Sequence, residues 1–318
     1  MPKARKPKKT LCYKLTTLCE DWQITFAHFR RALRDIQMKE ALGISENLRQ
    51  VILYEKTELK TEFAKALFGK DFYGPEEVTK AFKLGEVKAP PPDFSIHEMI
   101  RAKELGMALV YRTDQIGRIW LARETIAHIL QSKGRKTLDN LHFGRDNGAK
   151  DNRAAFWASG SPRPGWALVG KEGIEACEDK DYREQTEVLI NFLVENFYPV
   201  AKGGKLPEIY THAIHAYEAV RDDLLDSYRP LQDEAAVRIF KMLSINSLWR
   251  RTFAEILYDL VLMPEQNTQS LWNHELAADF HGNCCLQVYN SGDLIVFDQR
   301  SPIIGGGYTN AVFSIRKQ

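Results

Sequence analysis

The sequence predicts a mixed α+β protein, in which an N-terminal helical domain is followed by a second domain that ends in an antiparallel sheet. Apolar residues recur every three or four positions through most of the chain, which indicates amphipathic helices. Near the C-terminus the pattern changes to the alternation that is typical of strands. Between the two parts, the three consecutive prolines Pro90 to Pro92 cannot continue a helix. We therefore expect domains over residues 1–92 and 93–318.

Composition limits the class of protein. A chain of 318 residues suits one large or two ordinary domains. Hydrophobic residues make up 44% and charged residues 27%, a balance typical of globular proteins. The net charge is +2, so no field over the whole molecule attracts nucleic acid or a membrane surface. The sequence shows no apolar run of transmembrane length, and the basic N-terminus lacks the apolar segment of a secretory signal. Five scattered cysteines favour reduced thiols and a cytoplasmic location.

The first domain opens with a basic arm, Met1–Lys9. The arm is either a disordered solubilising tail or a small patch for phosphate backbones. Helical spacing of apolar residues then predicts helices over Leu11–Gln37 and Leu48–Phe68. A further short helix is predicted to begin at Pro75, because proline and the acidic residues after it favour a helix start.

The second domain is predicted to open with a helix over Ile96–Leu105, since Ser95 and Glu98 have the spacing of a capping box. A strand at Ala108–Arg112 and a helix at Trp120–Gln131 follow. After a polar insertion, the pattern predicts one strand and three helical stretches, namely Trp166–Val169, Tyr182–Phe197, Leu206–Leu225 and Ala235–Leu262. The last stretch is one bent helix or two.

Two groups of basic residues in this domain have a simple interpretation. Residues 132–161 are polar and basic and are expected to form a long loop or insertion. Their Lys and Arg side chains are either a solvated face or contacts for phosphates. Arg250 and Arg251, within the last helical stretch, are expected to be surface or helix-end charges.

The C-terminal tail, residues 273–312, differs from the rest of the chain in composition. Between Leu276 and Val312 it contains no Lys, Glu, Met or Trp and is rich in Asn, Asp, Gly, Ser and Tyr. Codons that end in a pyrimidine cannot encode Lys, Glu, Met or Trp, which would explain why these residue types are missing. Such codons cannot encode Gln either, so Gln287 and Gln299 do not fit this explanation. Turns also select Gly, Asn, Asp and Ser for their backbone chemistry. Both explanations stay open.

The tail is predicted to form a hairpin and a final strand. Leu286–Tyr289 and Leu294–Phe297 alternate as strands, and Asn290–Asp293 has the Asn and Gly chemistry of a hairpin turn. Ala311–Ile315 is the last predicted strand.

Several short motifs in the last half of the chain accompany the tail. They are Pro162-Arg-Pro-Gly-Trp-Ala-Leu-Val-Gly-Lys-Glu172, Tyr182–Leu189, Leu206–Tyr210, Arg251–Leu260, Arg300-Ser-Pro302 and Phe313-Ser314. Together they resemble uncharacterised bacterial proteins with a C-terminal variable region of the diversity-generating retroelement type. The resemblance implies a C-type-lectin-like fold, related to the formylglycine-generating-enzyme branch. It also implies tail codons rewritten at adenines through an error-prone reverse transcriptase, and a ligand-binding rather than a catalytic surface.

We therefore expect a non-catalytic protein, without a cofactor or metal, that binds a protein or another macromolecule through its tail loops. Loops on a rigid scaffold carry binding well, and Tyr, Ser, Gly and Asn are typical of such surfaces. The expected ligand-binding residues are Tyr289, Asn290, Asp293, Phe297, Arg300, Ile303, Ile304 and Tyr308. The expected scaffold residues of the tail are Val288, Leu294, Val296, Val312 and Ser314.

Three other functions stay open. The first is nucleic-acid binding by the basic arm and residues 132–153. The second is a metal-dependent enzyme that uses His281 with Cys284 and Cys285, to which His274 could add a ligand. Neighbouring residues of a strand point to opposite faces, so the adjacent cysteines do not suit one metal ion. The third is a structural or assembly role. The ligand and the oligomeric state do not follow from the sequence.

Overall fold

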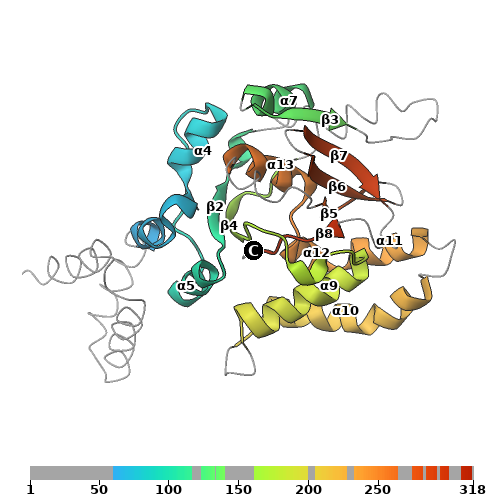
Figure 1. Cartoon of the computed structure of the whole chain (residues 1–318). Helices are drawn as coiled ribbons and strands as arrows, with labels where there is room; N and C mark the ends of the chain where they lie inside the picture. Colours follow the sequence, from blue (N-terminus) through green and yellow to red (C-terminus); the bar gives the residue numbers. More distant parts are fainter. Residues whose placement is uncertain are drawn as a thin grey trace, which may run out of the picture. The chain divides into compact units, whose positions relative to one another are not determined.

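A computed structural model of the chain gives a mixed α+β fold (Figure 1). It describes residues 60–116, 123–132, 134–139, 161–199, 205–227, 233–263, 274–281, 284–291, 294–300 and 309–316. The basic arm and the helix predicted over Leu11–Gln37 lie outside these residues. Two compact units are distinguished, one formed by Met1–Phe72 with Pro91–Ile100, and one by Tyr73–Pro90 with Arg101–Gln318.

The first unit confirms the predicted capping box. The Ser95 amide donates to the Glu98 carboxylate at 2.6 Å, and the Glu98 amide donates to the Ser95 hydroxyl at 3.2 Å. These two bonds satisfy amides that the first turn of a helix leaves without a partner. Helix α5, Ile96–Glu104, begins there as predicted. Residues 60–68, the part of the predicted second helix that is described, are also helical.

The first sheet has the strand order β1-β2-β4-β9. Its strands are β1 (Phe72–Tyr73), β2 (Ala108–Arg112), β4 (Gly165–Val169) and β9 (Ser314–Arg316). β2 pairs antiparallel with β4, and β4 pairs antiparallel with β9. The predicted strands at Ala108–Arg112 and Trp166–Val169 are therefore confirmed. All residues of β2 are buried, which explains why its sequence is almost continuously apolar.

The second sheet has the order β3-β7-β6-β5-β8. Its strands are β3 (Lys136–Asp139), β5 (His274–His281), β6 (Cys284–Ser291), β7 (Leu294–Arg300) and β8 (Thr309–Asn310). β5, β6 and β7 are antiparallel, so the predicted hairpin is confirmed. The sheet is mixed rather than antiparallel throughout, because β3 pairs parallel with β7 and β8 pairs parallel with β5. β3 belongs to the stretch that was predicted to be an irregular insertion.

Most of the helices lie where the apolar spacing predicted them. They are α4 (Pro75–Phe82), α7 (Arg123–Ser132), α9 (Tyr182–Asn191), α10 (Glu208–Ser227), α11 (Asp233–Met242), α12 (Ser244–Trp249) and α13 (Phe253–Leu262). α9 continues as a π-helical segment, Phe192–Phe197. Short 3-10 turns are η1 (Gly69–Asp71), η2 (Asp114–Ile116) and η3 (Glu175–Cys177). The stretch Ala235–Leu262 forms three helices, because Leu243 and Arg250 have extended backbones.

Helix α13 is the centre of the second unit. All ten of its residues are buried, including the two acidic residues Glu255 and Asp259. Figure 1 shows it between strands β2 and β4 on one side and β6 and β7 on the other. The Tyr258 hydroxyl donates to the Tyr111 carbonyl of β2 at 2.9 Å. On the other side, the ring of Phe253 lies 5.8 Å from that of Phe297 in β7.

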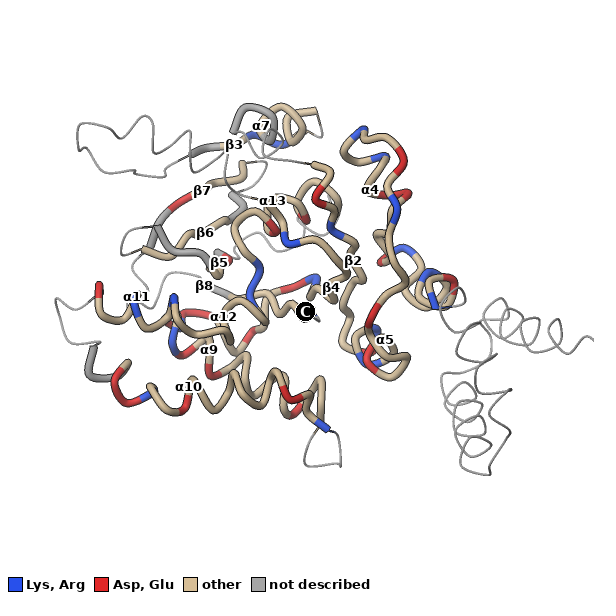
Figure 2. The backbone as a smooth tube through the Cα atoms, turned by 180° about the vertical axis from the view of Figure 1, so that it is seen from behind, with Lys and Arg blue, Asp and Glu red and all other residues tan. Residues whose placement is uncertain are grey.

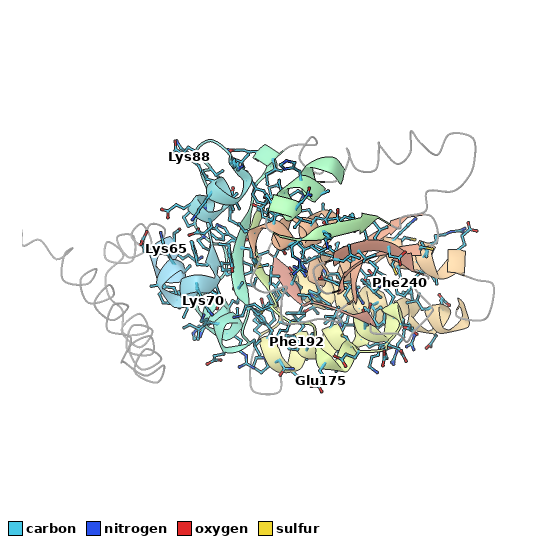
Figure 3. All side chains as sticks on the ribbon, turned by 45° about the horizontal axis from the view of Figure 1, so that its top comes forward. Lys65, Lys70, Lys88, Glu175, Phe192 and Phe240 are labelled. Atoms are coloured by element: carbon cyan, nitrogen blue, oxygen red, sulfur yellow. The ribbon has the colours of Figure 1, made fainter. Side chains whose placement is uncertain are left out.

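The helices α9 to α12 form a second layer of the core (Figure 3). The Phe192 ring lies 4.7 Å from Phe313, which precedes β9, and the Phe240 ring of α11 lies 4.9 Å from Tyr182 of α9. Aromatic pairs at these distances add to the apolar burial. Among the helices in the described ranges, none is long and apolar enough to cross a bilayer.

Candidate ligand-binding surface

The predicted ligand-binding residues are distributed over the second sheet and the segments beside it. Tyr289 and Asn290 belong to β6, and Phe297 and Arg300 belong to β7. The other four predicted residues, Asp293, Ile303, Ile304 and Tyr308, lie outside the described residues.

Phe297 is not a surface anchor. Its side chain is fully buried, and its ring contacts Phe253 of α13. The prediction placed it on an outward face because the flanking sequence alternates. Its neighbours Ile295 and Val296 are buried as well. Three consecutive buried residues mean that both faces of β7 are covered at this point. Phe297 is therefore part of the core.

The middle of the sheet is interior on both faces. Consecutive residues are buried in each central strand: Glu275–Ala277 in β5, Cys285–Val288 in β6 and Ile295–Phe297 in β7. The predicted scaffold residues Val288, Val296, Val312 and Ser314 are all buried, as expected, and Leu294 is half-buried. A partner that meets this sheet therefore meets its ends and not its middle.

Strand register separates the predicted residues between the two ends of the sheet. At one end Ser291 pairs with Leu294, close to Tyr289 and Asn290. At the other end Cys285 pairs with Arg300. Tyr289 is opposite Val296, so Arg300 lies four residues further along β7, about 13 Å at ~3.3 Å per residue. The predicted residues thus mark two places on the sheet.

The candidate metal ligands His281, Cys284 and Cys285 lie at the Arg300 end, whereas His274 lies at the opposite end of β5. His281 and Cys284 are opposite each other across β5 and β6, and Phe280 is opposite Cys285. The Cys284 side chain is half-buried and that of Cys285 is buried, which fits neighbouring side chains on opposite faces of a strand. Within the described part of the chain, no group of three or more His, Cys, Asp and Glu side chains has an arrangement that could hold a metal ion.

A cluster of buried charges links this sheet to the rest of the second unit. We call it the arginine cluster: it consists of Arg112, Arg163, Arg250, Arg251, Arg316, Glu255, Asp259 and Glu275. Figure 2 shows basic and acidic positions close together around α13 and β2. Arg250 and Arg251 were expected to be surface or helix-end charges. Arg250 does lie at the end of α12, but both side chains are buried, so the surface alternative was wrong.

Glu255 receives most of the contacts in the cluster. It is the third residue of α13, where its carboxylate accepts from the Thr252 amide at 2.8 Å. The same carboxylate accepts two bonds of 2.9 Å from Arg163 and one from Arg316. Arg112 lies 3.5 Å away. Charge-assisted bonds of this kind are about twice as strong as neutral ones.

Asp259 and Glu275 hold the remaining two-point ion pairs. Arg112 donates to both oxygens of Asp259, at 3.2 and 2.6 Å. Arg251 donates to both oxygens of Glu275 and, at 2.9 Å, to Asp259. Burial alone would lower the pKa of Arg112 and of Arg251. The neighbouring carboxylates outweigh that effect, so the net direction of both pKa values is upward and both guanidinium groups stay charged.

Arg250 is held by neutral groups. It donates to the Gln185 side chain at 3.0 Å, to the Tyr182 carbonyl at 3.0 Å and to the Thr186 hydroxyl at 3.3 Å. Its guanidinium also lies 4.0 Å from the centre of the Tyr182 ring, a favourable cation–π position. All of these groups belong to α9, so Arg250, at the end of α12, joins that helix to α9.

The ion pairs of the arginine cluster hold elements of the second unit together. Glu255, Asp259 and Arg112 are at most 1% exposed, and their polar atoms bond to one another. A substrate could not reach these carboxylates without breaking an ion pair. Because α13, β2, β5 and β9 each contribute at least one charge, the cluster joins both sheets to the central helix.

The sequence contained a signal for this cluster. Glu255 and Asp259 are four residues apart in an otherwise apolar helix, Phe253–Leu262. Acidic side chains at that spacing share one face of a helix. On a helix buried all round, they require cationic partners. The sequence does not say which of its arginines supply them.

The motifs that accompany the tail converge on the same core. The Pro162–Val169 motif supplies Arg163 and β4, the Tyr182–Leu189 motif supplies the partners of Arg250, and the Arg251–Leu260 motif is α13. Tyr210, from the Leu206–Tyr210 motif, donates to the Arg316 carbonyl at 3.1 Å. Each of these four motifs therefore contributes to the scaffold. Comparison of the chain with known protein families, with curated proteins and with solved structures finds no match in any of the three.

Proposed function

We propose that this is a non-catalytic recognition protein that binds a macromolecule through its C-terminal tail, on a C-type-lectin-like scaffold. In this proposal the tail is a variable region of the diversity-generating retroelement type. The observation that carries it is the tail itself, whose composition is typical of binding loops and whose central strands are fixed in the core. The residues at the ends of those strands and in the segments beyond them are then free to change without disturbing the fold.

The anchoring of β5 supports this proposal. Glu275 lies in the second position of β5 and forms a two-point ion pair with Arg251. Further along the same strand, the Ala278 amide donates to the Arg251 carbonyl at 2.9 Å. A strand that is held by both side-chain and backbone bonds keeps its register when neighbouring loops vary. A binding surface built on such strands is positioned before its partner arrives, which reduces the entropic cost of binding.

The separation of the predicted residues favours a macromolecule over a small molecule. Tyr289 and Arg300 lie near opposite ends of the sheet, separated by four residues of β7, about 13 Å. The interior middle of the sheet lies between them. A protein partner commonly covers about 800 Å² on each side and can contact both ends. A small ligand in one pocket could contact one end only.

A library selection tests the proposal. One library randomises Tyr289, Asn290, Asp293, Arg300, Ile303, Ile304 and Tyr308 together. A matched library of equal size randomises exposed positions of α10, namely Glu208, Ile209, His212, His215 and Glu218. Both are displayed and selected against one chosen folded protein. We expect folded members in both libraries but specific binders from the tail library alone. A tail library that yields mostly unfolded protein would contradict the proposal, because these positions would then be structural.

A further inference from the structure

Arg163 differs from the other arginines of the cluster in its exposure. Its side chain is 31% exposed, whereas those of Arg112, Arg251 and Arg316 are between 1% and 10% exposed. It nevertheless makes a two-point ion pair with the fully buried Glu255. Arg163 is thus the most exposed ion-pairing arginine of the cluster.

Arg163 and Arg316 bind the same three acceptors. Both donate to the Glu255 carboxylate. Arg163 donates to the Ser247 and Arg250 carbonyls at 2.6 and 3.4 Å, and Arg316 donates to the same carbonyls at 2.5 and 3.2 Å. These carbonyls lie at the end of α12, where helical carbonyls need outside donors. Each acceptor that Arg163 would leave therefore still has Arg316.

The ion-paired charges of the cluster also balance without Arg163. Arg112, Arg251 and Arg316 carry three positive charges, and Glu255, Asp259 and Glu275 carry three negative charges. Arg163 adds a fourth positive charge to these pairs, and Arg250 is a further positive charge on neutral acceptors. Removing one partner of a buried ion pair is costly when it leaves a charge uncompensated. Removing Arg163 leaves three positive and three negative charges in ion pairs.

Gly165 lies two residues after Arg163 and begins β4, where it is opposite Arg112 of β2. Its φ of +119° is a conformation open to glycine and strained for other residues. The next residue is fixed, since the Trp166 ring nitrogen donates to the Pro90 carbonyl at 2.7 Å and its ring lies 5.2 Å from Tyr111. Residues 161–164 therefore join a fixed strand at a glycine.

We propose that Arg163 is a releasable latch, which lets residues 161–164 open about Gly165 while the rest of the cluster stays closed. Opening exchanges the bonds of Arg163 for water and leaves Arg112 and Arg316 on Glu255. High ionic strength favours the open form, because an ion pair with one partly exposed partner is screened more than a fully buried pair, although less than a pair on the surface.

The test places a nitroxide label at position 161. The label is attached to a residue with a ketone side chain that replaces Ser161, so the native cysteines are not modified. Ser161 is exposed, so the label does not enter the core. The fraction of the label that is mobile is measured in the full-length chain with the natural Arg163 and in the full-length R163Q variant. The matched control is R101Q, because Arg101 is 34% exposed and donates to a main-chain carbonyl elsewhere. We expect R163Q to raise the mobile fraction about tenfold, in line with the loss of charge-assisted bonds, and R101Q to leave it unchanged.

Two further measurements decide the outcome. Thermal unfolding should show R163Q close to the natural protein and R316Q clearly less stable. In the natural sequence, the mobile fraction should rise with added NaCl, and R163Q should lose that dependence. The latch is refuted if R163Q destabilises the whole unit as much as R316Q does. It is also refuted if the mobile fraction of the natural sequence is independent of salt, a result that needs no variant to fold.

Discussion

Arg251 and Glu275 form a buried two-point ion pair between the segment that leads into α13 and the first strand of the tail sheet. Arg251 also donates to Asp259 of α13 at 2.9 Å. One guanidinium thus fixes the start of the tail relative to the central helix. The proposed binding surface depends on this connection, because residues at the ends of a strand keep their positions only when the strand does.

The first prediction concerns that ion pair. Replacing Arg251 by Met leaves Glu275 buried without its partner, and we expect a loss of about 3–5 kcal/mol in the free energy of unfolding. Replacing Glu275 by Leu in the same chain removes the uncompensated charge. The double variant R251M/E275L should therefore be more stable than R251M. Urea unfolding of the four chains of this cycle measures the difference. Equal stability of R251M and the natural protein would show that the pair does not anchor the sheet.

The second prediction concerns Phe297, which the alternation of its strand placed on the surface and the structure places in the core. Replacing it by Ala removes a buried ring in contact with Phe253. We expect a loss of about 3–5 kcal/mol, typical of such a change in a core. Replacing it by Leu, which keeps most of the volume, should cost less. Denaturant unfolding compares the two. If replacement by Ala caused no loss in the free energy of unfolding, Phe297 would have to be a surface residue.

The third prediction concerns pH. Burial raises the pKa of the Cys177 thiol to about 11, although the charges of Arg250 and Lys180 oppose the rise. In the unfolded chain the thiol loses its proton at its ordinary value, near 9.0. Between these two values the folded state holds the proton and the unfolded state does not. The free energy of unfolding therefore falls as pH rises through this window, by up to about 1.4 kcal/mol per pH unit.

Cys177→Ala isolates that contribution. The variant should lose less stability than the natural protein between about pH 9 and pH 10, below the ordinary pKa of tyrosine. Urea unfolding at several pH values measures both slopes. Equal slopes would mean that the Cys177 thiol has no raised pKa. Alkylation mapped by mass spectrometry gives an independent check, since the half-buried Cys284 should react in the folded protein before Cys177 does.

Local patterns were sufficient to predict much of the fold. β2 was predicted at its observed bounds and β4 to within one residue, because each is a short apolar run next to turn residues. α5 was predicted from its capping box, which the structure contains. The hairpin of β6 and β7 followed from alternation and from its turn. In each case the residues that determine the element are neighbours in the sequence.

The remaining features depend on residues far apart in the sequence. β3 is a polar strand of four residues that takes its place by pairing with β7. Arg112 and Asp259 are separated by 147 positions, yet they form a buried pair. Glu255 and Asp259 follow Arg251 closely in the sequence, but nothing nearby shows that Glu275 and groups of α9 also surround Arg250 and Arg251. The burial of both faces of β7 likewise depends on the packing of whole layers, and this explains why Phe297 was misplaced.

The most direct measurement for the proposed function is sequencing of the gene, from many cells of one culture, together with its flanking DNA. The account predicts a near-repeat of the DNA that encodes residues 273–312, differing from it at adenines, beside a gene for a reverse transcriptase. It also predicts that substitutions in the culture concentrate at the codons for Tyr289, Asn290, Asp293, Arg300, Ile303, Ile304 and Tyr308. An invariant tail without such a repeat would contradict the claim that this surface is diversified for recognition.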